Sequence, residues 1–229
     1  MNAMEMIRGP DVGPATNGKS AIVERIIRQI DRMIGDGELQ PGDPISEPTI
    51  CAAMNVSRVP VREAIRILAG EGVLELAQHR SARVRSPSAQ EITEMMEVLN
   101  GFSVLAIHLI CVGPPQPKLI EDLIEISARI KTMAKTKSTP TNDIWKEVRI
   151  YHLRLITGCG NEYLENMLRK TRMHYYSRHL IEILGPHALI EAAPTYVKIT
   201  KAIAQGEQQK AMRILFAQVE NSKTHARLL

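Results

Sequence analysis

Two arginines stand four residues apart in the stretch SRVPVREAIRILAGEG, which runs from Ser57 to Gly72. Arg58 and Arg62 lie on either side of Val59, Pro60 and Val61, with no acidic residue between them. A guanidinium group presents a fork of N–H donors that suits guanine O6 and N7 or a phosphate. A valine between two such groups can meet a thymine methyl. These residue types at this spacing favour binding to nucleic acid.

The basic character of this region is local. Residues 20–86 contain nine arginines and nine acidic residues, so their formal charges cancel. Five of those arginines fall in two windows without acids, 57–62 and 76–86, and the second window contains His79, Arg80 and Ser81. The net charge of the whole chain, +4, says less than this distribution.

Helices are expected on both sides of the first window. Apolar residues at helical spacing predict a helix over 21–34, and Ser46 is a suitable N-cap for a second helix over 47–54 that Asn55 ends. Ser57 is then the N-cap of a third helix that reaches residue 69. Its first turn tolerates Pro60, because those N–H groups lack intrahelical acceptors.

The third helix has two unlike faces. Arg58, Val59 and Arg62 lie on the face that is expected to be exposed. The face predicted to pack inward carries Val61, Ala64, Ile65 and Leu68.

Two extended runs, 73–76 and 82–85, predict a β-hairpin whose tip is the QHRS sequence. The preceding LQPGDPI segment, 39–45, is expected to form only a turn. A helix-turn-helix followed by a hairpin is a winged helix-turn-helix, which sets the start of its second helix into the major groove of DNA.

Beyond Ser88 the pattern is helical, with expected helices over 89–111, 118–136, 141–157, 161–184, 188–205 and 207–226. The apolar positions expected in the core are Ile92, Met95, Met96, Leu99, Phe102 and Ala106 in the first of these helices, and Leu119, Leu123, Ile126 and Ile130 in the second. Short connections predict an antiparallel bundle. The fold class is mainly α, with a flexible tail over 1–18, a winged helix-turn-helix DNA-binding domain over 19–87 and an all-helical domain over 88–229.

Composition excludes several classes of protein. The 229 residues are 44% hydrophobic but only 3% aromatic, which favours packed helices. Three cysteines without a CxxC spacing fit a reducing compartment and argue against a disulfide framework or a structural zinc site. Neither a signal peptide nor a run of 18 apolar residues is present, so a cytoplasmic protein without a membrane span is expected.

The run ISEPTICAAMNVSRVPVREAIRILAGEGVLELAQHRSARV resembles the GntR family of bacterial transcription regulators. In that family an SR-x-PVREA core opens the recognition helix, and L-x-x-x-G and a wing follow. The remainder resembles the effector-sensing FCD domain of the FadR-like branch, so the resemblance covers residues 20–229. It implies a sequence-specific regulator rather than an enzyme, most often a ligand-responsive repressor that binds a palindromic DNA operator as a homodimer.

The resemblance also implies which residues contact DNA. They are Ser57, Arg58, Val59 and Arg62 on the helix, and His79, Arg80 and Ser81 at the wing. Val59 stands where the family often has threonine, and Ser81 stands where the wing usually has glycine.

Many relatives hold a divalent metal in the helical domain through one aspartate and three histidines. The matching positions here are Val148, His152, Tyr196 and Gln218, so one ligand of four remains and no metal cofactor is expected. Leu99 lies near the place of an arginine that binds carboxylate effectors in relatives. We therefore expect an effector that is neutral or largely apolar, or one that contacts a different polar set. That set comprises Arg149, Tyr151, His152, His174 and Tyr196, although His152 and Tyr196 are equally well explained as hydrogen-bonded core residues.

Three alternatives remain. A substitute metal site at His174, His179 and His187 is disfavoured, because a five-residue spacing puts the first two on different helix faces. An enzyme would use Cys159 as nucleophile and His152 as base, yet no carboxylate is placed to orient the pair. A dimeric DNA-binding protein without an effector is the third.

Overall fold

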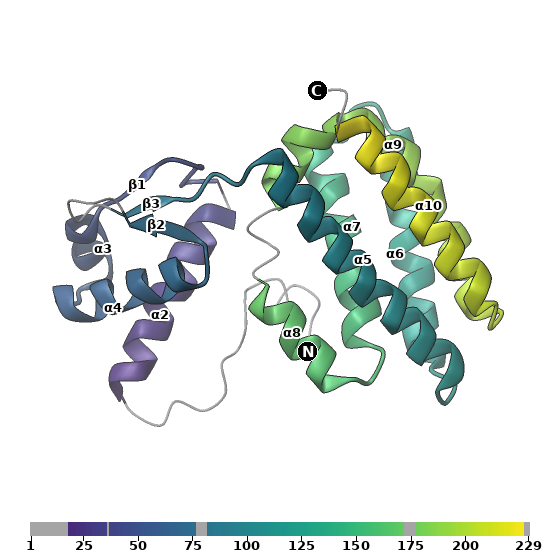
Figure 1. Ribbon diagram of the computed structural model, residues 1–229, viewed down its shortest axis with the longest axis horizontal. Coiled ribbons are helices and arrows are strands. Elements are labelled where there is room, and N and C mark those ends of the chain that lie inside the picture. The colour runs from purple at the N-terminus through teal and green to yellow at the C-terminus, as the bar shows by residue number, and fades with distance from the viewer. Residues whose placement is uncertain (1–17, 36, 77–81, 172–176, 227–229) are drawn as a thin grey trace. The chain divides into compact units, whose positions relative to one another are not determined.

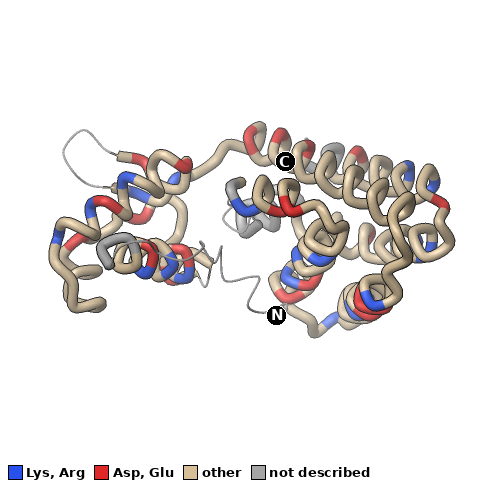
Figure 2. The backbone as a smooth tube through the Cα atoms, turned by 90° about the horizontal axis from the view of Figure 1, so that it is seen from below, with Lys and Arg blue, Asp and Glu red and all other residues tan. Residues whose placement is uncertain are grey.

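The computed structural model describes residues 18–35, 37–76, 82–171 and 177–226. The chain divides into two compact units at Pro87 and Ser88, and the second unit contains Ser88–Leu168 and Tyr176–Leu229. Basic and acidic residues are intermixed along the helices of both units, so neither unit is uniformly basic (Figure 2).

The first unit is a winged helix-turn-helix, as the sequence predicted (Figure 1). Its elements are α2 (Gly18–Gly35), β1 (Pro44–Ile45), α3 (Glu47–Met54), α4 (Arg58–Gly70), β2 (Leu74–Leu76) and β3 (Ala82–Val84). Ser46 caps α3 by accepting a hydrogen bond from the Thr49 N–H at 3.3 Å. Asn55 ends α3 in the left-handed region, at φ 53° and ψ 53°, which asparagine tolerates better than most residues. This turn positions α4.

The sheet has one strand more than the sequence predicted. The expectation of a simple turn over 39–45 was wrong at Pro44–Ile45, because β1 pairs antiparallel with β3 and the strand order is β1-β3-β2. A two-residue strand is too short to show the alternation that reveals a strand in sequence. The segment is recognised as a strand only by its pairing with β3, which lies about 40 residues later in the chain.

The predicted inward face of α4 is confirmed. Val61, Ala64 and Leu68 are fully buried and Ile65 is 5% exposed. They pack with the buried apolar face of α2, which consists of Val23, Ile26, Ile27, Ile30 and Ile34. This contact fixes how α4 presents its outer face.

The second unit is a helical bundle, also as predicted. Its helices are α5 (Ala89–Val112), α6 (Pro117–Lys135), α7 (Thr141–Thr157), α8 (Glu162–Lys170), α9 (Ser177–Ala204) and α10 (Gln208–Ala226). Within it α9 contacts α5, α6, α7 and α10. A capping box between Ser88 and Glu91 starts α5 at the position expected from the sequence.

The helix expected over 161–184 is not continuous. In the structure α8 ends at Lys170, and α9 begins at Ser177 and continues past a kink at Gly185, where φ is 66°. Proline at 186 cannot donate the hydrogen bond that a regular helix needs, so the chain changes direction there.

The buried face of α5 also differs from the expected one. Ile92 and Ala106 are buried as predicted, but Met95, Met96, Leu99 and Phe102 are only partly buried. The remaining buried positions are Asn100, Ser103, Ile107 and Ile110, while Val98, Leu105 and Val112 are 49%, 42% and 60% exposed. In contrast, the four positions predicted for α6 are all buried.

This arrangement leaves α5 with much uncovered apolar surface. Among the described helices, α5 is the one whose length and hydropathy would suffice to cross a membrane, and only 28% of the relevant window is buried. Length and composition are weak evidence for a span, because core helices share them. Here α5 packs against α7, α9 and α10 within the bundle.

Candidate DNA-binding and effector sites

The exposed start of α4 carries the predicted DNA-contacting residues. Arg58, Val59 and Arg62 are all exposed, and Val59 retains 74% of its accessible surface. Ser57 occupies the N-cap position, but its hydroxyl makes no capping hydrogen bond. The free N–H groups of a helix start attract anions, and an uncommitted serine hydroxyl adds a donor there.

The predicted wing tip lies outside the described residues. The three DNA-contacting residues predicted there are His79, Arg80 and Ser81. On the strand that follows, Arg83 is exposed and its Nη1 donates to the Gly42 carbonyl oxygen at 2.9 Å. Arg85 lies 3.9 Å from Glu75, measured from Nε to Oε1. These two arginines are therefore tied to the sheet that supports the wing.

Arg62 has a partner that sequence reasoning missed. Its Nε donates to Oε2 of Glu47 at 2.9 Å, and the two residues are 15 positions apart on α4 and α3. Nothing in the spacing reveals this pair, because the turn at Asn55 decides which residues of the two helices meet.

In the helical bundle, polar side chains from four helices meet at His152. Its Nδ1 lies 3.0 Å from the Ser103 hydroxyl, and its Nε2 lies 3.4 Å from the Tyr196 hydroxyl. Gln218 donates from Nε2 to the same Tyr196 oxygen at 2.8 Å. The positions that the family resemblance identified, His152, Tyr196 and Gln218, thus converge in space.

Buried aromatic groups surround this cluster. The Tyr151 hydroxyl lies 2.9 Å from the Thr200 hydroxyl, and the Tyr151 and Tyr196 rings meet edge-on with centroids 5.0 Å apart. Burial lowers the pKa of His152 to about 4 and raises the pKa of both tyrosines. The imidazole and both phenols are therefore neutral at pH 7.

These donors do not suit a divalent metal. Val148 is buried and has no ligating atom, and the neutral Tyr196 phenol and Gln218 amide are weak ligands beside a single imidazole. Within the described part of the chain, no three residues among His, Cys, Asp and Glu come close enough to hold an ion.

Other buried polar atoms near the cluster have no hydrogen-bond partner among the described residues. They include Oδ1 of Asn100, Nε of Arg149 and Oε1 of Gln218. Asn100 is one helical turn from Ser103, and Arg149 is one turn from His152. Burial lowers the pKa of Arg149. Such atoms mark a place where a ligand would make hydrogen bonds that the protein itself leaves unmade.

The described residues give no support to a metal site at His174, His179 and His187, or to an enzyme that uses Cys159. His174 lies outside the described residues, the side chain of His179 is not described, and His187 is exposed beside Glu191. Cys159 is buried, but the two nitrogens of His152 face Ser103 and Tyr196. Within the described residues, no hydrogen bond joins Cys159 to His152.

Two family models match consecutive parts of the chain. Residues 22–84 match bacterial regulatory proteins of the gntR family, and residues 91–221 match the FCD domain. Among curated proteins, the chain is 21% identical over 197 residues to the HTH-type transcriptional regulator YdhC of Bacillus subtilis (strain 168), covering 86% of this chain and 87% of that one.

Other relatives match over shorter lengths. The Glc operon transcriptional activator of Escherichia coli (strain K12) is 32% identical over 48% of this chain and 39% of its own length. The gluconate operon transcriptional repressor of Bacillus subtilis (strain 168) is 27% identical over 64% of this chain and 59% of its own.

Solved structures share the fold. E. coli McbR/YncC has a TM-score of 0.70 at 17% identity, covering 90% of this chain and 97% of that one. A GntR regulator from Rhodococcus sp. RHA1 has a TM-score of 0.68 at 21% identity over the same shares. With the two family models matching in the expected order, this chain belongs to the GntR family of DNA-binding transcription regulators, in the branch that carries an FCD domain.

Proposed function

We propose that this regulator is a homodimeric, ligand-responsive repressor that binds a palindromic operator. The observation that carries the proposal is the exposure of Arg58, Val59 and Arg62 at the start of α4. The opposite face of this helix is anchored in the core by the buried Val61 and Leu68. The relatives include proteins named as activators and proteins named as repressors, and repression relieved by a ligand is the mode proposed here.

The start of α4 enters the major groove. Arg58 and Arg62 have guanidinium forks that can read guanine or hold phosphates, and Val59 offers methyl groups to thymine. The Ser57 hydroxyl and the free N–H groups of the first turn bind a phosphate. His79, Arg80 and Ser81 of the wing follow the backbone or the minor groove.

Dimerisation uses the uncovered face of α5. Val98, Leu105 and Val112 are exposed at seven-residue intervals, and no charged residue occurs between Val98 and Val112. This uncharged stripe is about 21 Å long at 1.5 Å per residue. Gly101 within it is exposed and a Cβ added there would meet no atom within 4 Å, so two such helices can approach closely.

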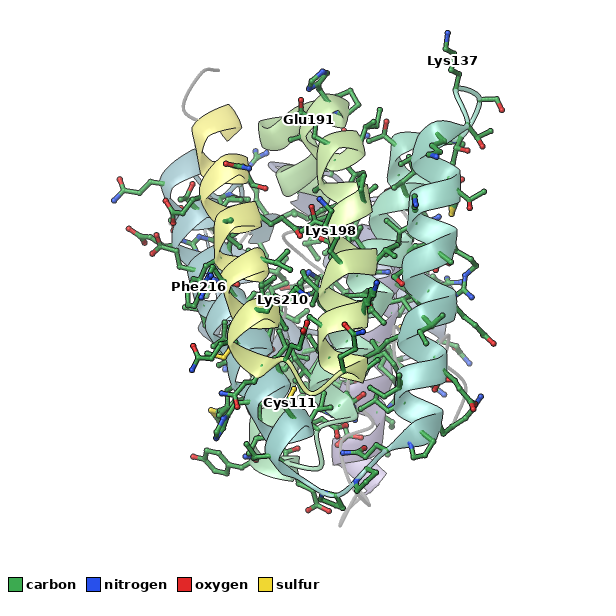
Figure 3. All side chains as sticks on the ribbon, turned by 90° about the vertical axis from the view of Figure 1, so that its right-hand side faces the viewer. Cys111, Lys137, Glu191, Lys198, Lys210 and Phe216 are labelled. Carbon is green, nitrogen blue, oxygen red and sulfur yellow. The ribbon has the colours of Figure 1, made fainter. Side chains whose placement is uncertain are left out.

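A second copy of the chain fits this stripe better than an unrelated partner. A patch without charge on a single helix is complementary to itself across a two-fold axis. Phe216 extends the patch on α10, which packs beside α5 (Figure 3). The same two-fold axis would present two copies of α4 to a palindrome.

The effector binds at the polar cluster of the bundle. The residues proposed to contact it are Arg149, Tyr151, His152, His174 and Tyr196. Atoms without partners near the cluster include a donor, Arg149 Nε, and two acceptors, Asn100 Oδ1 and Gln218 Oε1. A neutral molecule with a hydroxyl or amide group satisfies both kinds, because such a group donates and accepts. The two acceptors support a neutral effector, because an ionised carboxylate has no hydrogen to donate to them.

Duplex binding tests the DNA-binding part. An operator is first selected from a random duplex pool with the wild-type protein, and affinities are then measured by fluorescence anisotropy. Arg62→Ala should weaken operator binding by roughly 1–3 kcal/mol if Arg62 reads a guanine. Arg28→Ala, an exposed arginine on α2, is the matched control. Operator affinity unchanged by both Arg58→Ala and Arg62→Ala would disprove the proposed contact.

A ligand screen tests the effector part. Thermal shifts are recorded with neutral hydroxylated or amide-bearing compounds, and hits are tested for release of the selected operator. Arg149→Met should abolish the shift, whereas Arg213→Met, an exposed arginine on α10, should preserve it. If only compounds that bear a carboxylate stabilise the protein, the effector is not neutral.

A further inference from the structure

The contact between Glu47 and Arg62 joins the two helices of the helix-turn-helix. Glu47 Oε2 accepts from Arg62 Nε at 2.9 Å. The side chain of Glu47 is 21% exposed, and that of Arg62 is 48% exposed. The carboxylate is thus the better-packed partner, and the guanidinium extends from it toward solvent.

The backbone of Glu47 is held firmly. It is the first residue of α3, directly after the Ser46 cap, whose hydroxyl accepts from the Thr49 N–H at 3.3 Å and from the Thr49 hydroxyl at 2.7 Å. Pro48 fixes the next φ angle. A carboxylate in the first turn is also stabilised by the helix dipole. Glu47 is therefore a rigid support.

The bond uses the one nitrogen of Arg62 that base recognition does not need. A guanidinium has five N–H donors, and the pair of terminal nitrogens forms the fork that meets guanine O6 and N7. Occupying Nε leaves this fork available and restricts rotation of the plane that contains it. A side chain already held in place loses less conformational entropy on binding.

We propose that Glu47 is a specificity-determining positioning residue, which orients the fork of Arg62 for one base and lowers affinity for DNA that lacks it. This rests on the proposed contact between Arg62 and DNA. The carboxylate acts in two ways. It pre-orients Arg62 for the correct site, and its negative charge repels phosphates at every site. Only the first effect increases the ratio of operator affinity to nonspecific affinity, because the second lowers both affinities alike.

The experiment measures that ratio with the full-length protein. The probes are the selected operator duplex and a scrambled duplex of the same composition. Glu47→Gln removes the charge and weakens the ion pair while keeping the side chain's shape. Glu63→Gln is the matched control, because Glu63 follows Arg62 on α4 and is exposed, whereas the bond recorded for Arg62 Nε goes to Glu47. Melting temperatures confirm that each variant is folded.

The expected results separate positioning from charge. Glu63→Gln should strengthen binding to both duplexes and leave the ratio unchanged. Glu47→Gln should strengthen binding to the scrambled duplex but reduce the ratio by roughly fivefold or more, given the discrimination that a good bidentate contact supplies. In an Arg62→Ala background, Glu47→Gln should change the ratio no more than Glu63→Gln does, because no fork remains to be oriented.

Two results would overturn the inference. One is equal ratios for Glu47→Gln and Glu63→Gln while Arg62→Ala still weakens operator binding, which leaves the proposed function intact. The other is unchanged operator affinity in Arg62→Ala, which removes the DNA contact and this inference with it.

Discussion

The Nε2 atom of His152 lies 3.4 Å from the hydroxyl of Tyr196, and the family resemblance matches both positions to metal-binding histidines. The first position carries an imidazole, and the second carries a phenol that accepts a hydrogen bond from Gln218. Together with Ser103 these side chains form a neutral hydrogen-bonded cluster. Four predictions test the roles of this hydrogen-bonded cluster and of the exposed face of α5.

The first prediction concerns pH. Burial lowers the pKa of His152 from 6.5 to about 4. As the pH falls, His152 is therefore protonated in the unfolded chain before it is protonated in the folded protein. The contribution of neutral His152 to the free energy of unfolding is complete above pH 6.5 and is lost toward pH 4. The loss is at most about 3 kcal/mol, since His152 keeps some exposed surface. Denaturant unfolding at several pH values should show the free energy of unfolding falling between pH 6.5 and pH 4, and His152→Gln should reduce this fall. Tyr196→Phe, which keeps the imidazole, should retain it.

The second prediction concerns the hydrogen bond between Gln218 and Tyr196. Tyr196→Phe removes the acceptor of a 2.8 Å bond and leaves a buried amide donor unpaired. The free energy of unfolding should fall by roughly 1–3 kcal/mol. Tyr163→Phe is the control, because Tyr163 is 74% exposed and should change stability little. Equal stability of the two variants would mean that the bond contributes nothing.

The third prediction concerns metal. Isothermal titration of the purified protein with Zn²⁺ should show no tight binding, because only His152 is a strong ligand in the cluster. The triple variant Val148→Asp, Tyr196→His and Gln218→His supplies an aspartate and two histidines beside His152, and should gain zinc binding. Tight zinc binding by the wild type, lost in His152→Ala, would contradict this account of the cluster.

The fourth prediction concerns the dimer. Leu105→Lys places a charge in the middle of the uncharged α5 stripe and should shift the protein from dimer to monomer in sedimentation and light scattering. Operator affinity should fall with it, since two linked half-sites are bound more tightly than one. Ile124→Lys is the control, because Ile124 is 50% exposed on α6. A wild-type monomer, or a Leu105→Lys dimer, would place the interface elsewhere.

Sequence periodicity predicted the buried faces of α4 and α6 correctly because most of their apolar residues recur on one side, although Val59 and Ile124 are exposed. The same reasoning failed for α5. From Val98 to Val112 that helix is apolar on all sides, so the period of 3.6 residues does not select a face. Contacts with α7, α9 and α10 selected it, and they buried Asn100 and Ser103.

The sequence by itself predicted the two-unit architecture and the outward arginines at the start of α4, and it predicts that no metal is bound, because three of the four positions matched to metal ligands carry other residues. Each of these depends on local propensity or on motifs whose residues are close along the chain. Only the tertiary structure decided that Glu47 meets Arg62 and that Ser103, His152, Tyr196 and Gln218 meet in one place. Those contacts join residues between 15 and 49 positions apart. Helix crossing and turn geometry set them, and neither can be read from residue spacing.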